Sequence, residues 1–286
     1  MAKKLSDPKN TAEVIKKNEF AFKKKFGQNF LVDDRVLQRI VAGAGITKED
    51  RVLEIGPGIG TLTQALCEAA GEVRAVEIDR DLIPILKETL SDYDNVEIIN
   101  ADVMDLELSS VFSGSFKVVA NLPYYITTPI IMRLFESGAD IESITVMVQK
   151  EVADRMQAAP GGKDYGALTL SVAYNAEAEI IANVPPNCFM PRPEVSSAVI
   201  RLKRHEKPPV APKDPAYMFS VIRAAFSQRR KTLQNALSND RSLGVTKELI
   251  SEALSELGLD QRIRGERLSL SQFSGLSDLL LEKRAG

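Results

Sequence analysis

The sequence is poor in the residues on which several kinds of protein chemistry depend. Its 286 residues include two cysteines, Cys67 and Cys188, which form no C-x-x-C pair. This pattern excludes a disulfide scaffold and a cysteine-based metal site such as that of zinc, and it fits a reducing compartment. The single histidine, His205, removes most of the support for catalytic triads, H-E-x-x-H metal sites and histidine proton relays.

Long apolar stretches are missing as well. No run of 18 apolar residues occurs, so we expect no membrane-spanning helix and no membrane partner. The lysine-rich N-terminus lacks the apolar segment of a secretory signal, and we therefore expect a cytoplasmic protein. An apolar fraction of 44% and a charged fraction of 27% are ordinary for a folded chain, and this length suggests one or two domains.

The charge is nearly balanced in total but unevenly distributed. The chain has 37 Lys+Arg against 39 Asp+Glu, a balance unlike the basic character usual in nucleic-acid-binding proteins. Counted by segment, the net charge is +5 over 1–31, −13 over 32–200, +7 over 201–231 and −1 over 232–286. Two basic segments around an acidic body favour contact with phosphate, because association depends on the local field. A solvated surface is the alternative for such lysine and arginine runs.

Residues 51–157 alternate short apolar strands with amphipathic helices, which is typical of βαβ units and a parallel sheet covered on both faces. Strands are predicted at 51–55, 72–78, 96–99, 116–120 and 143–149, and helices at 61–70, 80–90, 128–137 and 150–157. A further helix is predicted at 33–43, whereas residues 1–20 suit a frayed helix or an arm. Residues 168–174 and 197–202 are predicted to be strands that pair antiparallel at one sheet edge. The fold class is therefore α/β, a Rossmann-like sheet of seven strands.

A proline-rich linker at 208–212 separates this region from a helical one. Residues 214–286 contain no convincing strand, and apolar stripes at 218–226, 249–257 and 276–280 predict helices. We therefore predict a catalytic domain with its N-terminal arm over 1–207 and a small helical domain over 208–286.

A glycine-rich loop, Gly56-Pro57-Gly58-Ile59-Gly60, follows the first predicted strand. Its glycines permit a tight turn and the close approach of a ligand, and the helix behind it favours negative charge. Glu77 ends the second strand, where a carboxylate can bridge the ribose hydroxyls of NAD and of S-adenosylmethionine alike. Asp102 follows the third strand and can accept a hydrogen bond from an adenine amino group or cap a helix. A nucleotide-like ligand is favoured because these groups follow three successive strands.

The most informative motif is Asn121-Leu122-Pro123-Tyr124-Tyr125, after the fourth strand. The exocyclic amine of a purine is a poor nucleophile because its lone pair is delocalised into the ring. Acceptors for its two hydrogens, the Asn121 side-chain oxygen and a carbonyl at Leu122 or Pro123, would favour rehybridisation. Tyr124 offers a stacking face, and water can take the proton from the methylated ammonium. The alternative is an Asn-Pro turn with two core tyrosines, and we assign Tyr125 to packing.

Together these motifs resemble the family of small-subunit ribosomal RNA adenine N6,N6-dimethyltransferases, whose loss gives kasugamycin resistance. The matching segments cover nearly the whole chain and are Lys25–Leu31, Gly56–Gly60, Asn121–Tyr124, Gln149–Ala153, Phe189–Pro193 and Phe226–Leu233. The resemblance implies transfer of two methyl groups from S-adenosylmethionine to each of two adjacent adenines near the 3′ end of small-subunit rRNA. It also implies that the partner is an immature ribosomal subunit, and we expect the free protein to be a monomer. Ala101 and Ser196 depart from the family's usual Gly and Asp.

The resemblance further implies roles for individual residues. The cofactor would be contacted by Asn29, Leu31, Gly56, Gly58, Glu77, Asp102 and Asn121. The target adenine would be held by Asn121, Pro123, Tyr124 and Phe189, with Phe189 on the second face of the base and a core position as its alternative. RNA would be bound by Lys23, Lys24, Lys25, Arg223, Arg229, Arg230 and Lys231. We expect Arg223 and Arg229–Lys231 to share one helix.

Three other functions stay open at this point. A large-subunit rRNA adenine methyltransferase of the macrolide-resistance type would share the catalytic domain, but the complete match at Phe226–Leu233 favours the small-subunit enzyme. A nicotinamide oxidoreductase would share the glycine loop but gives no role to Asn121–Tyr124. A non-catalytic rRNA-binding assembly factor is disfavoured by the intact Asn121 and Glu77.

Overall fold

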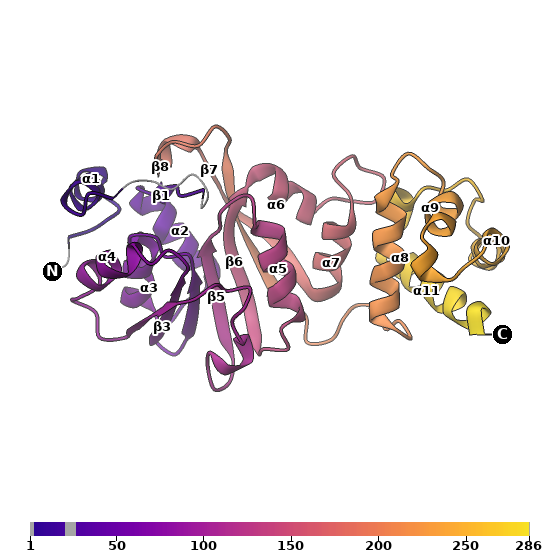
Figure 1. Ribbon diagram of the computed structural model, residues 1–286, viewed down its shortest axis with the longest axis horizontal. Helices are drawn as coiled ribbons and strands as arrows, with labels where there is room; N and C mark the ends of the chain where they lie inside the picture. Colours follow the sequence, from indigo (N-terminus) through magenta and orange to yellow (C-terminus); the bar gives the residue numbers. More distant parts are fainter. Residues whose placement is uncertain (1–2, 21–26, 286) are drawn as a thin grey trace. The chain divides into compact units, whose positions relative to one another are not determined.

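The structure is a computed structural model that describes residues 3–20 and 27–285 (Figure 1). The predicted RNA-binding residues Lys23, Lys24 and Lys25 therefore lie outside the described residues. By its internal contacts the chain forms two units, one of Met1–Ala153 with Glu177–Arg204 and one of Asp154–Ala176 with His205–Gly286. Within the described part of the chain, no helix combines the length and apolar character needed to cross a membrane.

A mixed sheet of seven strands forms the first unit, as predicted, in the order β4-β3-β2-β5-β6-β9-β7. The strands are β2 (Arg51–Ile55), β3 (Glu72–Glu77), β4 (Val96–Asn100), β5 (Phe116–Asn121), β6 (Ile141–Gln149), β7 (Ala176–Val184) and β9 (Ser197–Arg204). Strands β2 to β6 pair in parallel, and β9 pairs antiparallel with β6. Because parallel strands require crossover connections, the loops that follow them meet at one edge of the sheet.

The helices of this unit are α2 (Asp34–Ala44), α3 (Thr61–Ala69), α4 (Leu82–Thr89), α5 (Thr127–Glu136) and α6 (Lys150–Met156). They confirm the predicted helices to within two residues at either end. Asp33 caps α2 by accepting hydrogen bonds from the next backbone N–H groups, and Gly45 ends the helix in the left-handed conformation. Buried side chains of α2 and α3 pack with Val52, Val119 and Val199 of the sheet, which covers one of its faces.

One predicted strand is wrong. Residues 167–175 form a helix, α7 (Ala167–Asn175), instead of a strand at 168–174, and the strand next to β9 is β7. The segment Leu168–Tyr174 is apolar at most positions, so its periodicity does not separate a buried helix from a buried strand. The deciding contacts are local: the Thr169 hydroxyl accepts a hydrogen bond from Gly166 N and donates one to the Arg155 carbonyl.

The second unit is helical, as predicted for the C-terminal region (Figure 1, orange and yellow). With α7 it contains α8 (Pro215–Ser227), α9 (Leu233–Asn239), α10 (Lys247–Glu256) and α11 (Leu270–Ala285). Its core includes Met218, Leu237, Leu254 and Phe273, all fully buried. The seven-residue α9 was not predicted, because it is too short to show a periodic apolar stripe; Thr232 caps it through Asn235 N.

The basic cluster of this unit does not lie on one helix. Helix α8 ends at Ser227, so Arg229, Arg230 and Lys231 belong to the turn before α9. The prediction that they share a helix with Arg223 is therefore wrong. The helix ends here because Gln228, the residue after Ser227, has non-helical backbone angles.

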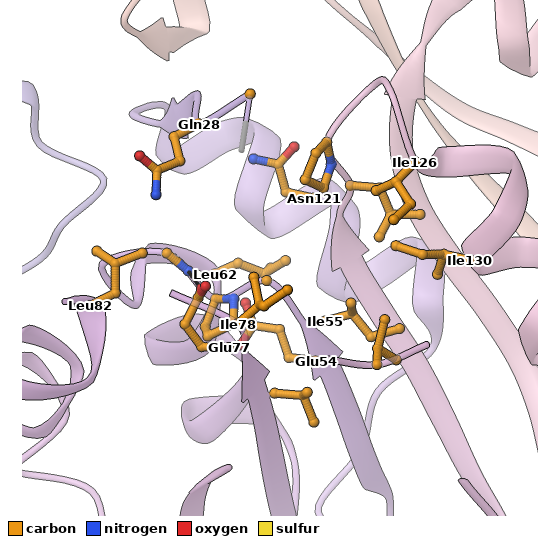
Figure 2. Close-up of a pocket in the computed structure, with 18 of the residues that line it drawn as sticks. Gln28, Glu54, Ile55, Leu62, Glu77, Ile78, Leu82, Asn121, Ile126 and Ile130 are labelled. Atoms are coloured by element: carbon orange, nitrogen blue, oxygen red, sulfur yellow. Dashed lines mark hydrogen bonds between the residues drawn. The ribbon is translucent and has the colours of Figure 1, made fainter. Parts of the chain in front are cut away.

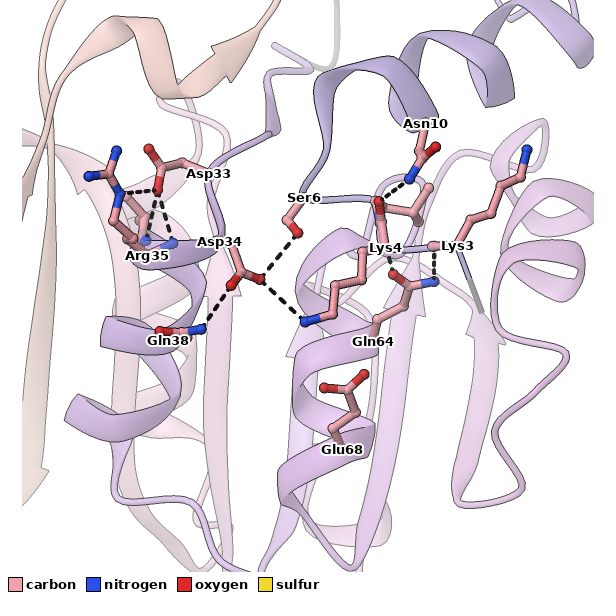
Figure 3. A network of polar contacts seen from close by, with 12 residues as sticks. Lys3, Lys4, Ser6, Asn10, Asp33, Asp34, Arg35, Gln38, Gln64 and Glu68 are labelled. Carbon is pink, nitrogen blue, oxygen red and sulfur yellow. Dashed lines mark hydrogen bonds and ion pairs between the residues drawn. The ribbon is translucent and has the colours of Figure 1, made fainter. Parts of the chain in front are cut away.

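Residues 3–20 belong to the first unit and contain a helix, which is one of the two alternatives predicted for this segment. They form α1 (Pro8–Lys17), and Leu5, which is 1% exposed, packs with Phe30, Ile59 and Leu82. The buried Gln64 of α3 accepts a hydrogen bond from Leu5 N at 3.1 Å. It donates to the carbonyl of Lys3 at 3.3 Å (Figure 3). It also donates to the carbonyl of Thr89 at 3.1 Å.

We expect Gln64→Leu to lower the free energy of unfolding by about 1–3 kcal/mol, because a buried backbone N–H and two carbonyls lose their partner. Gln38→Leu is the matched control, because Gln38 is exposed on α2 and donates one bond, to Asp34 at 2.8 Å. It should change the free energy by less than about 0.5 kcal/mol. Chemical denaturation measures both, and equal losses would contradict the role given to Gln64.

Candidate active site

A cavity opens in the first unit where the parallel strands end (Figure 2). It is lined mainly by five segments, 27–31, 54–58, 76–78, 101–103 and 121–126, with further side chains from α3, α4 and α5. This is the edge at which open α/β sheets bind ligands. All seven residues predicted to contact the cofactor line the cavity, namely Asn29, Leu31, Gly56, Gly58, Glu77, Asp102 and Asn121.

The glycine loop lines this cavity in a backbone conformation that residues other than glycine rarely adopt. Gly56 has φ +70° and Gly58 has φ +62°, both in the left-handed region. A Cβ atom added to Gly58 would lie 2.9 Å from Cε1 of Phe30, so a side chain there would displace the aromatic ring. The loop is also joined to the neighbouring strand, because Gly58 N donates to Oε2 of Glu77 at 3.2 Å.

Glu77 is a buried carboxylate at the end of β3, 5% exposed. Besides Gly58, it accepts a hydrogen bond from Asp79 N to Oε1 at 2.8 Å. Burial raises the pKa of Glu77 to about 7, although both backbone donors favour the ionised form. Such a carboxylate has lone pairs left to accept hydrogen bonds from the hydroxyl groups of a ligand.

Asp102 lies in the loop after β4, the strand next to β3, and lines the cavity. Its Oδ1 accepts a hydrogen bond from Met104 N at 2.9 Å. The residues after it form a turn, so the helix cap considered as an alternative is not formed. One carboxylate oxygen therefore orders the loop, and the carboxylate borders the cavity.

Asn121 ends β5 and is held by the N-terminal segment. Its Nδ2 donates to the carbonyl of Asn29 at 3.0 Å, so two residues predicted separately are brought together. This bond fixes which end of the amide is the donor, and Oδ1 is the acceptor on the other end. Figure 2 shows Asn121 and Ile126 on one side of the cavity, with Glu54 and Glu77 across from them.

The residues after Asn121 form a closed turn. The Pro123 carbonyl accepts hydrogen bonds from Ile126 N at 3.2 Å and from the Thr127 hydroxyl at 3.1 Å. Because this carbonyl is already used twice, the choice between Leu122 and Pro123 as the second acceptor for an amine favours Leu122. The half-buried Tyr124 lines the cavity, and its hydroxyl shares a 2.8 Å hydrogen bond with the buried Ser197.

Two aromatic residues are placed differently from what the sequence suggested. Phe189 lies in β8 (Phe189–Met190), pairs with Leu31 of β1 (Phe30–Leu31) and is 5% exposed. It belongs to the apolar core of the unit and does not line the cavity, so its contact with a base stays a prediction. Tyr125, which we assigned to packing, is 60% exposed and borders the cavity, so that assignment is wrong.

Sequence reasoning missed Glu54, the fourth residue of β2. Its side chain is 1% exposed and lines the cavity, and among the described residues its buried Oε2 has no hydrogen-bond partner (Figure 2). The pKa of Glu54 is raised to about 8, mainly by burial; the nearby Thr63 hydroxyl opposes this rise and the charge of Glu77 adds to it. The signal was present, because a carboxylate inside an otherwise apolar strand is costly without a partner. Two buried carboxylates suit a ligand that carries positive charge.

We expect Glu54→Gln to stabilise the ligand-free protein more at pH 8.5 than at pH 5.5. The folded-state pKa of Glu54 lies above its unfolded value, so its contribution to stability is complete below the unfolded pKa. That contribution is lost as the pH rises through about 8, whereas glutamine does not ionise. Melting temperatures at the two pH values test this, with the exposed Glu68→Gln of α3 as control. An equal shift at both pH values would contradict the burial of an ionisable Glu54.

Comparison with known proteins gives a family. Residues 19–273 match the family described as ribosomal RNA adenine dimethylase. A relative from Lachnoclostridium phytofermentans, named ribosomal RNA small subunit methyltransferase A, is 60% identical over 285 residues, which cover 98% of each chain. A relative of the same name from Geobacillus thermodenitrificans is 50% identical over 288 residues, again with 98% of each chain covered.

Solved structures agree with this match over the whole fold. A dimethyladenosine transferase from Plasmodium falciparum is 28% identical with a TM-score of 0.76, covering 90% of this chain and 98% of its own. The 23S rRNA methyltransferase ErmE is 29% identical with a TM-score of 0.67, covering 88% and 99%. On the match over residues 19–273, the chain belongs to the ribosomal RNA adenine dimethylase family, which consists of S-adenosylmethionine-dependent methyltransferases.

Proposed function

We propose that this protein dimethylates the N6 amino groups of two adjacent adenines near the 3′ end of small-subunit rRNA. The observation that carries this proposal is the fixed amide of Asn121 at the cavity, next to a closed turn that presents Tyr124. The relatives named small subunit methyltransferase are 48–60% identical to this chain, whereas the 23S rRNA enzyme is 29% identical. This difference supports the small subunit over the large subunit as the source of the substrate.

The residues of the cavity fit S-adenosylmethionine. Glu77 can accept hydrogen bonds from ribose hydroxyls and Asp102 from the adenine amino group, while Gly56 and Gly58 allow close approach to the backbone. Glu54 Oε2 is buried and has no hydrogen-bond partner within residues 3–20 and 27–285, and a ligand that carries a sulfonium and an ammonium favours ionisation of this carboxyl group. When bound, the cofactor supplies an electrophilic methyl group.

The chain then has to make a poor nucleophile reactive. Asn121 Oδ1 and the Leu122 carbonyl accept the two hydrogens of the adenine N6 amine, which favours the pyramidal nitrogen needed for attack. The turn at Pro123 holds these acceptors in place, and the Tyr124 ring, held through its hydroxyl by Ser197, stacks on the base. Each transfer would form one N–C bond as the S–C bond to the transferred methyl group breaks, with the neutral thioether of the cofactor as leaving group. One proton would then pass from the methylated ammonium to water, so no side chain has to act as a general base.

We propose that the helical domain over 208–286 docks on RNA through exposed basic residues. Arg223, Arg230 and Lys231 are exposed. Arg229 is exposed as well, but it also has internal partners: its Nη2 donates to the carbonyls of Lys163 at 2.9 Å and Tyr165 at 3.1 Å. These bonds join the turn after α8 to the loop before α7 within the second unit.

We expect Arg230→Ala to weaken rRNA binding and to lower the slope of log Kd against log salt by about one, because one phosphate contact is lost. The neighbouring Arg229→Ala should lower the melting temperature instead, because two backbone carbonyls lose their donor. Filter binding at several salt concentrations, with thermal melts of both variants, separates the two roles. Equal salt slopes for wild type and Arg230→Ala would contradict a phosphate contact.

The reaction itself is tested with radiolabelled S-adenosylmethionine. We expect methyl transfer to immature small subunits and not to unmodified large-subunit rRNA, with the protein acting in the cytoplasm as a monomer. Asn121→Ala should lower kcat by about 100-fold or more, because a preorganised acceptor is lost, while rRNA binding stays within a few-fold.

Asn10→Ala, on α1 outside the cavity, is the control and should keep its activity. Cofactor binding by the Asn121 variant is measured separately by calorimetry, because Asn121 also holds Asn29. Unchanged turnover in Asn121→Ala would overturn its catalytic role. Preferred transfer to large-subunit rRNA would overturn the substrate.

A further inference from the structure

Tyr125 is the feature of the active site that the reaction described above leaves unused. Among the described residues, large apolar side chains are exposed at three positions, Ile78, Tyr125 and Val195, and Tyr125 is the most exposed at 60%. An isolated exposed aromatic residue is common on protein surfaces and needs no explanation. Tyr125 differs because it also lines the cavity, next in sequence to the tyrosine that faces the target base.

The backbone under Tyr125 is rigid. Tyr124 and Tyr125 are the two central residues of the turn that the bond from Ile126 N to the Pro123 carbonyl closes. Helix α5 begins directly afterwards, at Thr127, whose buried hydroxyl binds the same carbonyl. The backbone that carries Tyr125 is therefore held beside the cavity.

One side of the Tyr125 ring borders the backbone of the chain. Gly27 has φ +56°, and a Cβ atom there would lie 3.7 Å from Cδ1 of Tyr125 and 3.8 Å from Cβ of Pro123. A side chain at position 27 would therefore touch the Tyr125 ring, and glycine leaves that space free. The remaining surface of the ring is open to solvent, so it can receive another planar group.

The chemistry of the substrate provides such a group. An adenine that enters the cavity has left the base stack, and the nucleotide beside it then has an uncovered face. Aromatic side chains stack on such bases in single-stranded RNA whatever the base identity, because every base has a π face. Tyr124 can serve one base only, since its hydroxyl is held by Ser197 and its ring lies in the cavity.

We propose that Tyr125 stacks on the nucleobase adjacent to the target adenine and thereby sets the RNA strand at the mouth of the cavity. This inference rests on the proposed function, because it requires an RNA substrate whose target adenine is unstacked. Tyr125 is then a binding residue for the RNA, separate from the acceptors that activate the amine. It adds affinity for the strand without contributing to the chemical step.

Steady-state kinetics on immature small subunits tests the assignment. We expect Tyr125→Ala to raise KM for the subunit by about tenfold, because base stacking on a side chain is worth that much or more, with kcat reduced less than KM is raised. Tyr125→Phe should restore the wild-type KM, because stacking needs the ring and not the hydroxyl. Tyr93→Ala is the control for loss of a tyrosine ring outside the cavity. Because Tyr93 is partly buried and packs on the core, the melting temperatures of both variants are compared as well.

A second measurement uses the absence of tryptophan from the chain. Tyr125→Trp introduces a single fluorophore, whose emission we expect to be quenched by an unmodified oligoribonucleotide of the methylated region. Replacing the nucleotide beside the target adenine with an abasic residue should remove the quenching. The abasic replacement should also raise the KM of the wild type for the RNA. It should not raise the KM of Tyr125→Ala beyond the value that this variant already has, which is the coupling expected of two stacked groups.

The outcomes are distinguishable from failure of the proposed function. A wild-type protein that transfers no methyl group to any rRNA overturns the function and this inference with it. An active wild type whose Tyr125→Ala variant keeps the same KM overturns the stacking alone. The stacking is also overturned if the emission of Tyr125→Trp is unchanged when filter binding shows the oligoribonucleotide to be bound. Equal sensitivity of wild type and Tyr125→Ala to the abasic residue has the same consequence.

Discussion

The hydrogen bonding of β2 to both β3 and β5 is the interaction on which the active site depends. In this register Ile55 lies beside Val76 and Ala120, so the three strands end side by side. The residues that follow them are the glycine loop, Glu77 and Asn121. The pairing of the strands therefore brings together segments that are far apart in the sequence. A shift of one residue in either pairing would turn each of these side chains to the other face of the sheet.

Two buried carboxylates at this edge of the sheet lower the stability of the free protein. Glu54 and Glu77 are both buried, and burial raises the pKa of each to near or above neutrality. A core made only for stability would contain no such pair, since unpaired buried charge is unfavourable. Their presence is explained by a cationic ligand, which lowers the cost of ionising them when it binds. The two carboxylates thus lower the stability of the free protein and raise its affinity for such a ligand. The hydrogen bonds that Glu77 accepts from two backbone N–H groups offset part of the lost stability.

Much of this could be predicted from the sequence, because the relevant signals are local. A strand followed by Gly-x-Gly-x-Gly, with a carboxylate or an amide at the ends of later strands, specifies the ligand edge of an α/β sheet, and all seven predicted cofactor positions line one cavity. The predictions failed where the deciding contact is distant or the local pattern ambiguous. Residues 167–175 are apolar at most positions, so strand and helix could not be separated.

Exposure was the other limit. Tyr124 and Tyr125 are adjacent and of the same type, and only the fold shows that Tyr124 is half-buried whereas Tyr125 is 60% exposed. Arg229 looked like its neighbours, and only the fold shows that the carbonyls of Lys163 and Tyr165 receive its guanidinium. The burial of Glu54 was predictable in principle, since it lies within an apolar strand. The role of Glu54 could not be predicted, because the sequence does not show whether the fold places a hydrogen-bond partner next to a carboxylate within a strand.

The scarcity of histidine has a physical explanation in this geometry. An amine that attacks a sulfonium methyl needs no base to make it anionic; it needs its lone pair withdrawn from the ring, and its proton leaves afterwards. Hydrogen-bond acceptors at fixed positions do this work, and the bond from Asn121 to the Asn29 carbonyl fixes the position of one of them. A fixed Asn121 amide, however, does not determine which RNA strand presents the amine. Recognition has to come from groups that remain accessible, and the turn that follows Asn121 combines both properties, because Tyr124 is held by Ser197 while the adjacent Tyr125 is open to solvent.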